Sequence, residues 1–132
     1  MATNQGMYYY TKEEIDELNT DQSTYSTTEK AVGTWIDGST IYRKTIEFGS
    51  LPNATTKNVA HNISNLSHVV KVEAIAKSGT RFFPLPSAQP DSLTYIIRVT
   101  VEGSNINIVT GADRSDFNAY VTLYYTKLET SS

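Results

Sequence analysis

One stretch, residues 29–52, limits what this chain can fold into more than any other. It holds the only Trp of the chain and two runs of β-branched and aromatic residues, with Asp37 and Gly38 between them. Glycine accepts the positive φ of a tight turn, and an aspartate side chain can bond back to its own backbone. The pattern therefore predicts a β-hairpin with strands at 30–36 and 40–48, in which Asp37 makes the turn.

The rest of the chain repeats this β pattern, with turn-forming residues at short intervals. Alternation of apolar and polar residues is clearest at 93–102, whereas two prolines restrict 81–86 to an edge strand or an extended crossing segment. Further strands are expected at 58–61, 68–77, 105–110 and 117–127. Together these segments predict an all-β fold, an antiparallel and jelly-roll-like β-sandwich of about seven or eight strands.

The segment 68–77 needs its own argument, because Glu, Ala and Lys also favour a helix. Its density of Val favours a strand, and the two faces of that strand would differ. The face expected to be buried is small and apolar: Val70, Val72, Ala74 and Ala76. The opposite face is mostly charged: Val69, Lys71, Glu73, Ile75 and Lys77.

The domain organisation follows from a change in composition near residue 28. Residues 1–28 are expected to form an anchor segment, and residues 29–132 a β-sandwich knob domain. Thr11 and Glu14 have the spacing of a capping box, which predicts a helix of two turns at 12–19. A helix of this length is too short to be stable alone in water, so it must pack against something.

What the N-terminal helix packs against is open. Tyr8, Ile15 and Leu18 have the spacing of a coiled-coil seam. One interpretation is a helix folded onto the chain's own β-body. The other is a segment that packs between copies or binds another protein, with the polar stretch 20–28 as its linker.

Composition and charge exclude several classes of partner. The net charge is −3 and only 19% of residues are charged, which opposes an electrostatic grip on nucleic acid. The absence of Cys excludes a disulfide framework and a Cys-ligated metal site. Residues 1–10 lack the basic start and apolar run of a signal peptide, and no segment approaches the roughly 18 apolar residues that span a bilayer. We therefore expect no membrane insertion, and synthesis in a cytoplasm.

Residues that could carry catalysis or bind a metal are few. His61 and His68 have no predicted carboxylate or second histidine beside them, so both are expected to be structural. One polar loop places Asp113 and Asp116 around Arg114, but the arginine would oppose a cation, and a capped turn with local ion pairing is expected. No Ser-His-Asp order, phosphate loop or nucleophile elbow occurs. We expect no enzyme, no cofactor and no metal.

The stretch EKAVGTWIDGSTIYRKTIEFGSLPN at 29–53 resembles a signature near the start of the head domain in many tailed-phage fibre and receptor-binding proteins. The similarity continues at 61–65, at 105–111 and in the Tyr-rich end 120–127. Such domains are fibre tips or knobs and are usually trimers. The resemblance therefore implies a homotrimeric virion protein, assembled in the cytoplasm of a bacterial host, whose N-terminal segment binds other virion proteins.

Two functions from different classes follow. The first is a short head or tail fibre that recognises a glycan or protein on the host surface. The second is a purely structural capsid or tail decoration that binds only other virion proteins. A glycan-cleaving enzyme is set aside for want of a carboxylate pair.

Candidate site residues follow from position rather than from a motif. Rings on the more polar face of the last strand suit an interface, and loops held by a rigid scaffold carry binding residues disproportionately. The candidates for oligomerisation or anchoring are Tyr8, Ile15, Leu18, Tyr120 and Tyr124. The candidates for ligand binding, in the loop 111–116, are Asp113, Arg114 and Asp116.

Overall fold

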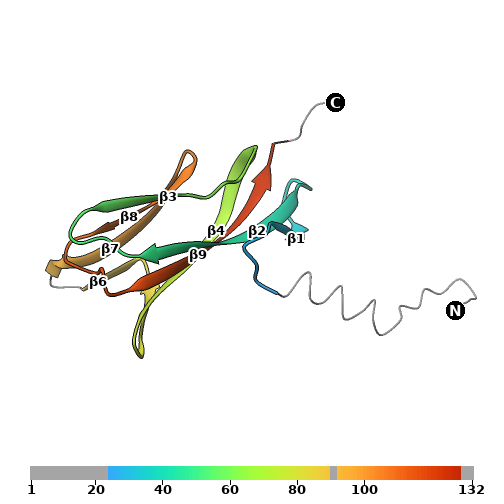
Figure 1. The fold of residues 1–132 in the computed structure, drawn as a ribbon. Coiled ribbons are helices and arrows are strands. Elements are labelled where there is room, and N and C mark those ends of the chain that lie inside the picture. Colours follow the sequence, from blue (N-terminus) through green and yellow to red (C-terminus); the bar gives the residue numbers. More distant parts are fainter. Residues whose placement is uncertain (1–23, 90–91, 129–132) are drawn as a thin grey trace, which may run out of the picture.

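The computed structural model describes residues 24–89 and 92–128, and within these ranges all regular structure is β-strand (Figure 1). The strands form two antiparallel sheets. The larger sheet has the order β1 (Lys30–Thr34), β2 (Thr40–Ser50), β9 (Asn118–Lys127), β4 (Leu66–Ser78) and β5 (Arg81–Leu85). The smaller sheet has the order β3 (Thr56–Ala60), β8 (Asn105–Thr110), β7 (Ser92–Glu102) and β6 (Ser87–Gln89). The predicted all-β class is confirmed, whereas the predicted helix at 12–19 lies outside the described residues.

The hairpin predicted around Asp37 is present as β1 and β2. The Asp37 carboxylate accepts a hydrogen bond from the backbone N–H of Ser39 at 2.8 Å, and Gly38 has a φ of 90°. Asp37 therefore makes the turn, as predicted. β1 ends at Thr34, earlier than expected, because Trp35 uses its own N–H and C=O to close the turn.

Strand β9 lies at the centre of the larger sheet, between β2 and β4. Four of its side chains point inward and are at most 2% exposed: Ala119, Val121, Leu123 and Tyr125. They belong to one hydrophobic cluster that also includes Ile97, Ile106 and Ile108 of the smaller sheet. Burying a large apolar side chain stabilises a fold by about 1.5–3 kcal/mol. The two sheets thus share one core.

On the other strands, side chains predicted to face the core are buried where the two sheets overlap. Ile97 in β7 and Ala76 in β4 are fully buried. Val72 lies on the same face of β4 as Ala76 but is 39% exposed. Figure 1 shows the smaller sheet grouped at the end of the molecule opposite the β1–β2 hairpin, so the larger sheet extends beyond it. Alternation predicted the direction of Val72, and the limited extent of the second sheet leaves it exposed.

Two lysines connect β2 and β3 across the two sheets. Lys57 Nζ donates to the carbonyls of Phe48 at 3.2 Å and Ser50 at 2.7 Å. Lys44 Nζ donates to the carbonyls of residues 61 and 62 at 2.9 and 3.1 Å. Hydrogen bonds from a charged donor are stronger than neutral ones. The pair therefore satisfies backbone acceptors at the end of β2 and just after the end of β3.

The described residues before β1 continue beside the edge of β2, and Tyr25 lies over the outer face of the larger sheet, the face turned away from the core. The backbone N–H of Thr45 donates to the carbonyl of Ser26 at 2.9 Å, and the Arg43 guanidinium donates to the carbonyl of Thr24 at 2.7 Å. The ring of Tyr25 lies 4.3 Å from Arg43 Cζ. The chain thus enters the β-body along the edge of β2, and Arg43 is left only 6% exposed.

Candidate functional site

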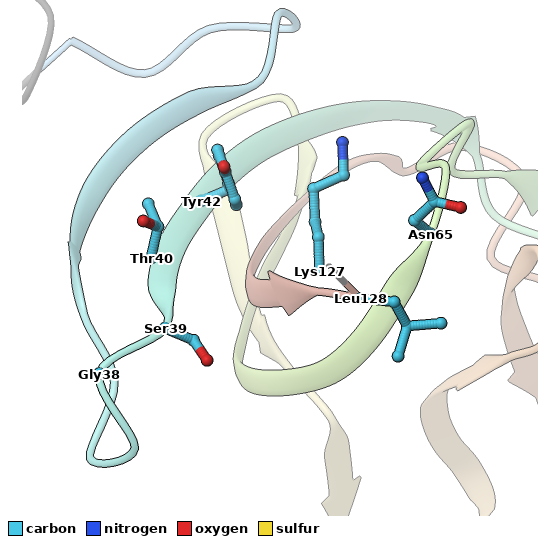
Figure 2. Close-up of a pocket in the computed structure, with 7 residues that line it drawn as sticks. All are labelled: Gly38, Ser39, Thr40, Tyr42, Asn65, Lys127 and Leu128. Carbon is cyan, nitrogen blue, oxygen red and sulfur yellow. The ribbon is translucent and has the colours of Figure 1, made fainter. Parts of the chain in front are cut away.

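Figure 2 shows an open pocket at the hairpin end of the molecule, where the β1–β2 turn, the loop before β4 and the end of β9 meet. Its volume is about 510 Å³. The lining residues are Gly38, Ser39, Thr40, Tyr42, Asn65, Lys127 and Leu128. The view places Lys127 between Tyr42 and Asn65, so one ammonium, one ring and one amide border the space.

The charge at this pocket is neutralised within the protein. Lys127 Nζ donates to one carboxylate oxygen of Glu29 at 3.1 Å, and the Tyr125 hydroxyl donates to the other at 2.5 Å. Burial, together with the adjacent Glu29 carboxylate, raises the pKa of the Tyr125 phenol. The Tyr42 ring stacks on Tyr125 with centroids 6.0 Å apart. What the pocket offers a ligand is therefore hydroxyl and amide groups.

The chemistry that the pocket allows is hydrogen bonding to a polar ligand. Its lining residues include no carboxylate, His or Cys, so they form neither an acid–base pair nor a nucleophile with its base. In the part of the chain that the structure describes, no group of three or more His, Cys, Asp or Glu side chains could hold a metal ion. Nor does any helix among these residues have the length and apolarity to cross a membrane.

The two histidines make structural contacts. His61 is buried, with Nε2 2.9 Å from the carbonyl of Gly103 and Nδ1 accepting from the N–H of Ile63 at 3.1 Å. These partners place the ring proton on Nε2. His68 is exposed and packs on Trp35 with ring centroids 5.8 Å apart.

The predicted ligand-binding residues do not converge on one point. Asp113 accepts hydrogen bonds from the N–H and the hydroxyl of Ser115 at 2.9 and 2.6 Å, which hold its pKa below the usual range. Asp116 accepts from the hydroxyl of Ser78 at 3.1 Å. The sequence placed both aspartates around Arg114, whereas the structure bonds each of them to a serine.

Arg114 lies against aromatic rings. Its Cζ is 5.2 Å from the ring centroid of Tyr95, 5.6 Å from that of Phe83 and 5.7 Å from that of Phe117. Its Nε atom is buried without a hydrogen-bond partner. A guanidinium over ring faces is stabilised by the ring quadrupole, so this side chain supports the packing of the loop.

The predicted oligomerisation residues divide into two groups. Tyr120 is 54% exposed on the outer face of the larger sheet, as an interface residue would be in a free chain. Tyr124 lies on the same face, but its hydroxyl is 3.0 Å from that of Tyr25. The candidates outside the described residues are Tyr8, Ile15 and Leu18.

Tyr25 joins Tyr124 to a charged cluster on this face. Its hydroxyl also donates to Glu73 at 3.3 Å. The hydrogen bond with Tyr124, followed by burial, raises the pKa of Tyr25 to about 12. Burial opposes the charged form of Glu73, but Lys71 at 3.2 Å and the tyrosine hydroxyls outweigh it and hold the Glu73 pKa below its usual range. The half of the outer face next to β1 is thus filled by polar and cation–π contacts.

The other half of the outer face carries exposed apolar side chains, of which the sequence had indicated only Tyr120. Strand pairing sets Tyr120 opposite Ile75, and Ile75 opposite Pro84, in one row across β9, β4 and β5. Phe82 lies in the next row, opposite Lys77. Ile75 is 44% exposed and Phe82 57%. We call Ile75, Phe82, Pro84 and Tyr120 the apolar patch.

An open groove borders the apolar patch. It has a volume of about 760 Å³, and its lining includes Glu47, Lys77, Asp116 and Tyr120. A signal for this surface was present in the sequence, since Ile75 is a large aliphatic residue on a face otherwise expected to be charged. Its partners in the patch come from distant segments, and only the strand order brings them together.

No family model, no curated protein and no solved structure matches this chain. A functional proposal therefore rests on the geometry of the described residues and on the resemblance of residues 29–53 to the phage-fibre signature.

Proposed function

We propose that this chain is a structural protein of a tailed-phage virion, a short trimeric fibre of the head or tail. The observation that carries the proposal is the division of its surface. One outer face exposes large apolar side chains, as a protein-binding surface does, while polar loops occupy the end opposite the hairpin. The segment 29–53, which resembles the head-domain signature of phage fibres, supports it by forming the β1–β2 hairpin and the start of the loop after it.

The proposal includes the finer architecture. The two sheets pack as an antiparallel, jelly-roll-like sandwich over their shared cluster. Support comes from the connections, because β2–β3, β3–β4, β5–β6 and β8–β9 each join one sheet to the other. Sheets that exchange strands in this way are held together by the chain itself as well as by the core.

The two ends of the protein have different tasks in this proposal. Residues 1–28 anchor the chain to the virion, through contacts between copies and with other virion proteins in which Tyr8, Ile15 and Leu18 take part. Residues 29–132 form the knob. The loop with Asp113, Arg114 and Asp116 lies between β8 and β9 and contacts a glycan or protein on the host surface. Three copies raise the avidity of a weak contact without any new interaction.

The proposal is tested on virions of the phage that encodes the chain. Gold-labelled antibody against the β-body should decorate purified particles at fixed positions on the head or tail. Mass spectrometry of the same particles should find the chain in a multiple of three copies. Particles that contain none of the chain would contradict the proposal.

A second candidate function is a decoration that binds only other virion proteins. One observation favours it: Asp113 and Asp116 are already hydrogen-bonded to serines, and Arg114 lies on rings, so few free groups remain for a host ligand. The variant Asp113→Asn/Asp116→Asn separates the two functions, because an amide oxygen can keep each hydrogen bond while both charges are lost. Adsorption of the folded variant to host cells should fall if the loop contacts the host. Equal adsorption would favour the decoration.

A further inference from the structure

The groove beside the apolar patch brings together polar groups from three parts of the chain. Glu47 on β2 pairs with Tyr120 on β9, and Lys77 on β4 pairs with Asn118, the preceding residue on the same face of β9. Asp116 comes from the loop between β8 and β9. All five line the same open space of about 760 Å³. Two carboxylates, an ammonium, an amide and a phenol ring therefore border one groove.

The charged groups of this groove are not used up by contacts within the protein. Glu47, Lys77 and Asp116 take part in no ion pair with another described residue. Asp116 accepts a hydrogen bond from Ser78 at Oδ2, and no described residue donates to its Oδ1. All three charged side chains are exposed. They can therefore bond to a ligand without breaking an ion pair.

Tyr120 supplies the aromatic ring of the groove. It is 54% exposed, and among the described residues no other ring stacks on it. The ammonium of Lys77 lies over a different ring, 5.6 Å from the centroid of Phe82. An aromatic side chain with a few convergent polar groups is the usual lining of a small-molecule site. The ring of Tyr120 is thus open to a ligand.

We infer that this groove binds a neutral carbohydrate, with one sugar ring on Tyr120 and the sugar hydroxyls bonded to the polar rim. A pyranose has C–H groups on its faces and hydroxyls around its edge, so it suits an exposed ring beside mixed donors and acceptors. Glu47 and Asp116 accept hydrogen bonds, and Lys77 donates them. The amide of Asn118 does both. The volume of the groove lies within the roughly 300–1,000 Å³ of ligand pockets.

The charge of the groove selects against anionic ligands. Its two carboxylates outweigh its one ammonium, so a sugar that carries a uronate, sialate or phosphate group would be repelled. The same balance, together with the net charge of −3, opposes a nucleic acid. A neutral sugar meets no such repulsion.

The position of the groove disfavours a peptide as its occupant. The groove lies over β9, whose backbone pairs with β2 on one side and with β4 on the other. An extended peptide adds to a free strand edge, and an amphipathic helix needs an apolar groove. This groove has a fully paired strand beneath it and charged groups at its rim, so it suits neither.

Asp116 belongs both to the groove and to the loop that is proposed to contact the host. The sugar binding rests on the proposed function for its source, the host surface, and the host contact then extends from the loop onto the outer face of the larger sheet. Binding of a free sugar in solution depends on the groove alone.

A printed array of oligosaccharides tests the binding with the full chain. Among neutral members built from glucose, galactose, mannose or N-acetylhexosamine, at least one should bind. The same glycan with a uronate, sialate or phosphate group should bind less. Isothermal titration with the best neutral binder then measures its Kd. A chain that binds no neutral glycan, or only acidic ones, would overturn the inference.

A matched pair of aromatic variants places the sugar in the groove. Tyr120→Thr should weaken binding by more than about tenfold, because the ring is lost while the β-propensity is kept. Phe82→Thr is the control, since Phe82 is 57% exposed on the same face but does not line the groove. Binding by this control should be unchanged. Circular dichroism establishes that each variant is folded.

A matched pair of acidic variants tests the polar rim. Glu47→Gln should weaken binding by about threefold or more, because a charged acceptor becomes a neutral one. Glu102→Gln makes the same change on the outer face of the smaller sheet and should leave the Kd unchanged.

The outcomes separate the sugar site from the proposed function. Equal binding by the wild type, Tyr120→Thr and Glu47→Gln would overturn the groove as the site. An equal loss in Phe82→Thr and Tyr120→Thr would also overturn it, because the apolar patch would then be the binding surface. Whether the chain is found in virions is measured independently by the antibody labelling, and particles without it would leave the sugar binding in solution unaffected.

Discussion

The outer faces of the two sheets come from the same alternating strand pattern but have different surfaces. The smaller sheet presents mostly polar and charged side chains, with the aliphatic Val109 among them: Thr56, Asn58, Arg98, Thr100, Glu102, Asn105 and Asn107. One side-chain hydrogen bond within this set joins Asn107 to Glu102 at 3.1 Å. The larger sheet presents a docked chain segment on one half and the apolar patch on the other. Alternation therefore predicts which side chains leave the core, but not whether they meet water or protein.

The largest difference in stability between the two outer faces should appear when one arginine is removed from each of them. Arg43→Ala on the larger sheet should lower the free energy of unfolding by about 2–3 kcal/mol, because a buried charged donor and its stacking on Tyr25 are lost together. Arg98→Ala on the smaller sheet should change it by no more than about 0.5 kcal/mol, since Arg98 is exposed. Urea denaturation measures both. Equal losses would mean that the segment 24–28 does not stabilise the larger sheet.

A smaller loss of stability is expected when a hydrogen bond at the centre of the larger sheet is removed. The hydroxyls of Thr45 and Thr122 are 2.8 Å apart, and Thr122 is 6% exposed. Thr122→Val should cost about 1 kcal/mol because it leaves the Thr45 hydroxyl without its partner. The double variant Thr45→Val/Thr122→Val should recover most of that loss.

The control for the threonine pair is the hydrogen bond of the other face. Asn107→Ala breaks a bond that is open to water and should change stability by less than about 0.5 kcal/mol. Additive effects of the two threonine changes, or a larger loss at Asn107, would contradict the contrast between a covered and a solvated face.

The smallest effect should be a dependence of stability on alkaline pH. The Tyr25 pKa is raised from 10.0 to about 12, so the unfolded chain releases this proton at lower pH than the folded protein does. The stability that Tyr25 contributes is complete below pH 10 and should be lost as pH rises through the window between 10 and about 12. Tyr25→Phe should be less stable than the wild type at pH 9, and its stability should fall less steeply above pH 10.

Urea midpoints measured across this range test the prediction, with tyrosinate absorbance followed in parallel. Because the Tyr125 pKa is also raised, only the difference between wild type and Tyr25→Phe is informative. Curves of equal slope would show that Tyr25 does not contact Tyr124 in solution.

Local features of the fold could be read from the sequence because they depend on neighbouring residues. The turn at Asp37 needs two adjacent residues, and the inward face of β9 follows from simple alternation. Tyr120 was named from the sequence, but the apolar patch around it could not be predicted, because Tyr120, Ile75 and Pro84 meet only through the order of β9, β4 and β5. Periodicity shows which way a side chain points, and it does not show which strand lies beside it.

The prediction of local ion pairing in the loop between β8 and β9 was wrong for a related reason. Its two aspartates and one arginine were expected to pair locally, since they are close in sequence. Asp116 instead accepts a hydrogen bond from Ser78, which is 38 residues away, and Arg114 lies on rings from β5 and β7. Distant partners of this kind depend on the packing of the two sheets, which one segment does not encode.

Chemical labelling of the two lysines that connect β2 and β3 can report how the junction between the sheets opens. An amine-reactive reagent needs a free, uncharged amine, and Lys44 and Lys57 each have their ammonium group bound to two carbonyls. Exposed Lys77 has no such restraint in the free chain. Acylation should therefore proceed quickly at Lys77 and slowly at the other two. The rate at Lys44 and Lys57 would then report how often the two sheets separate, residue by residue, in a single mass spectrum.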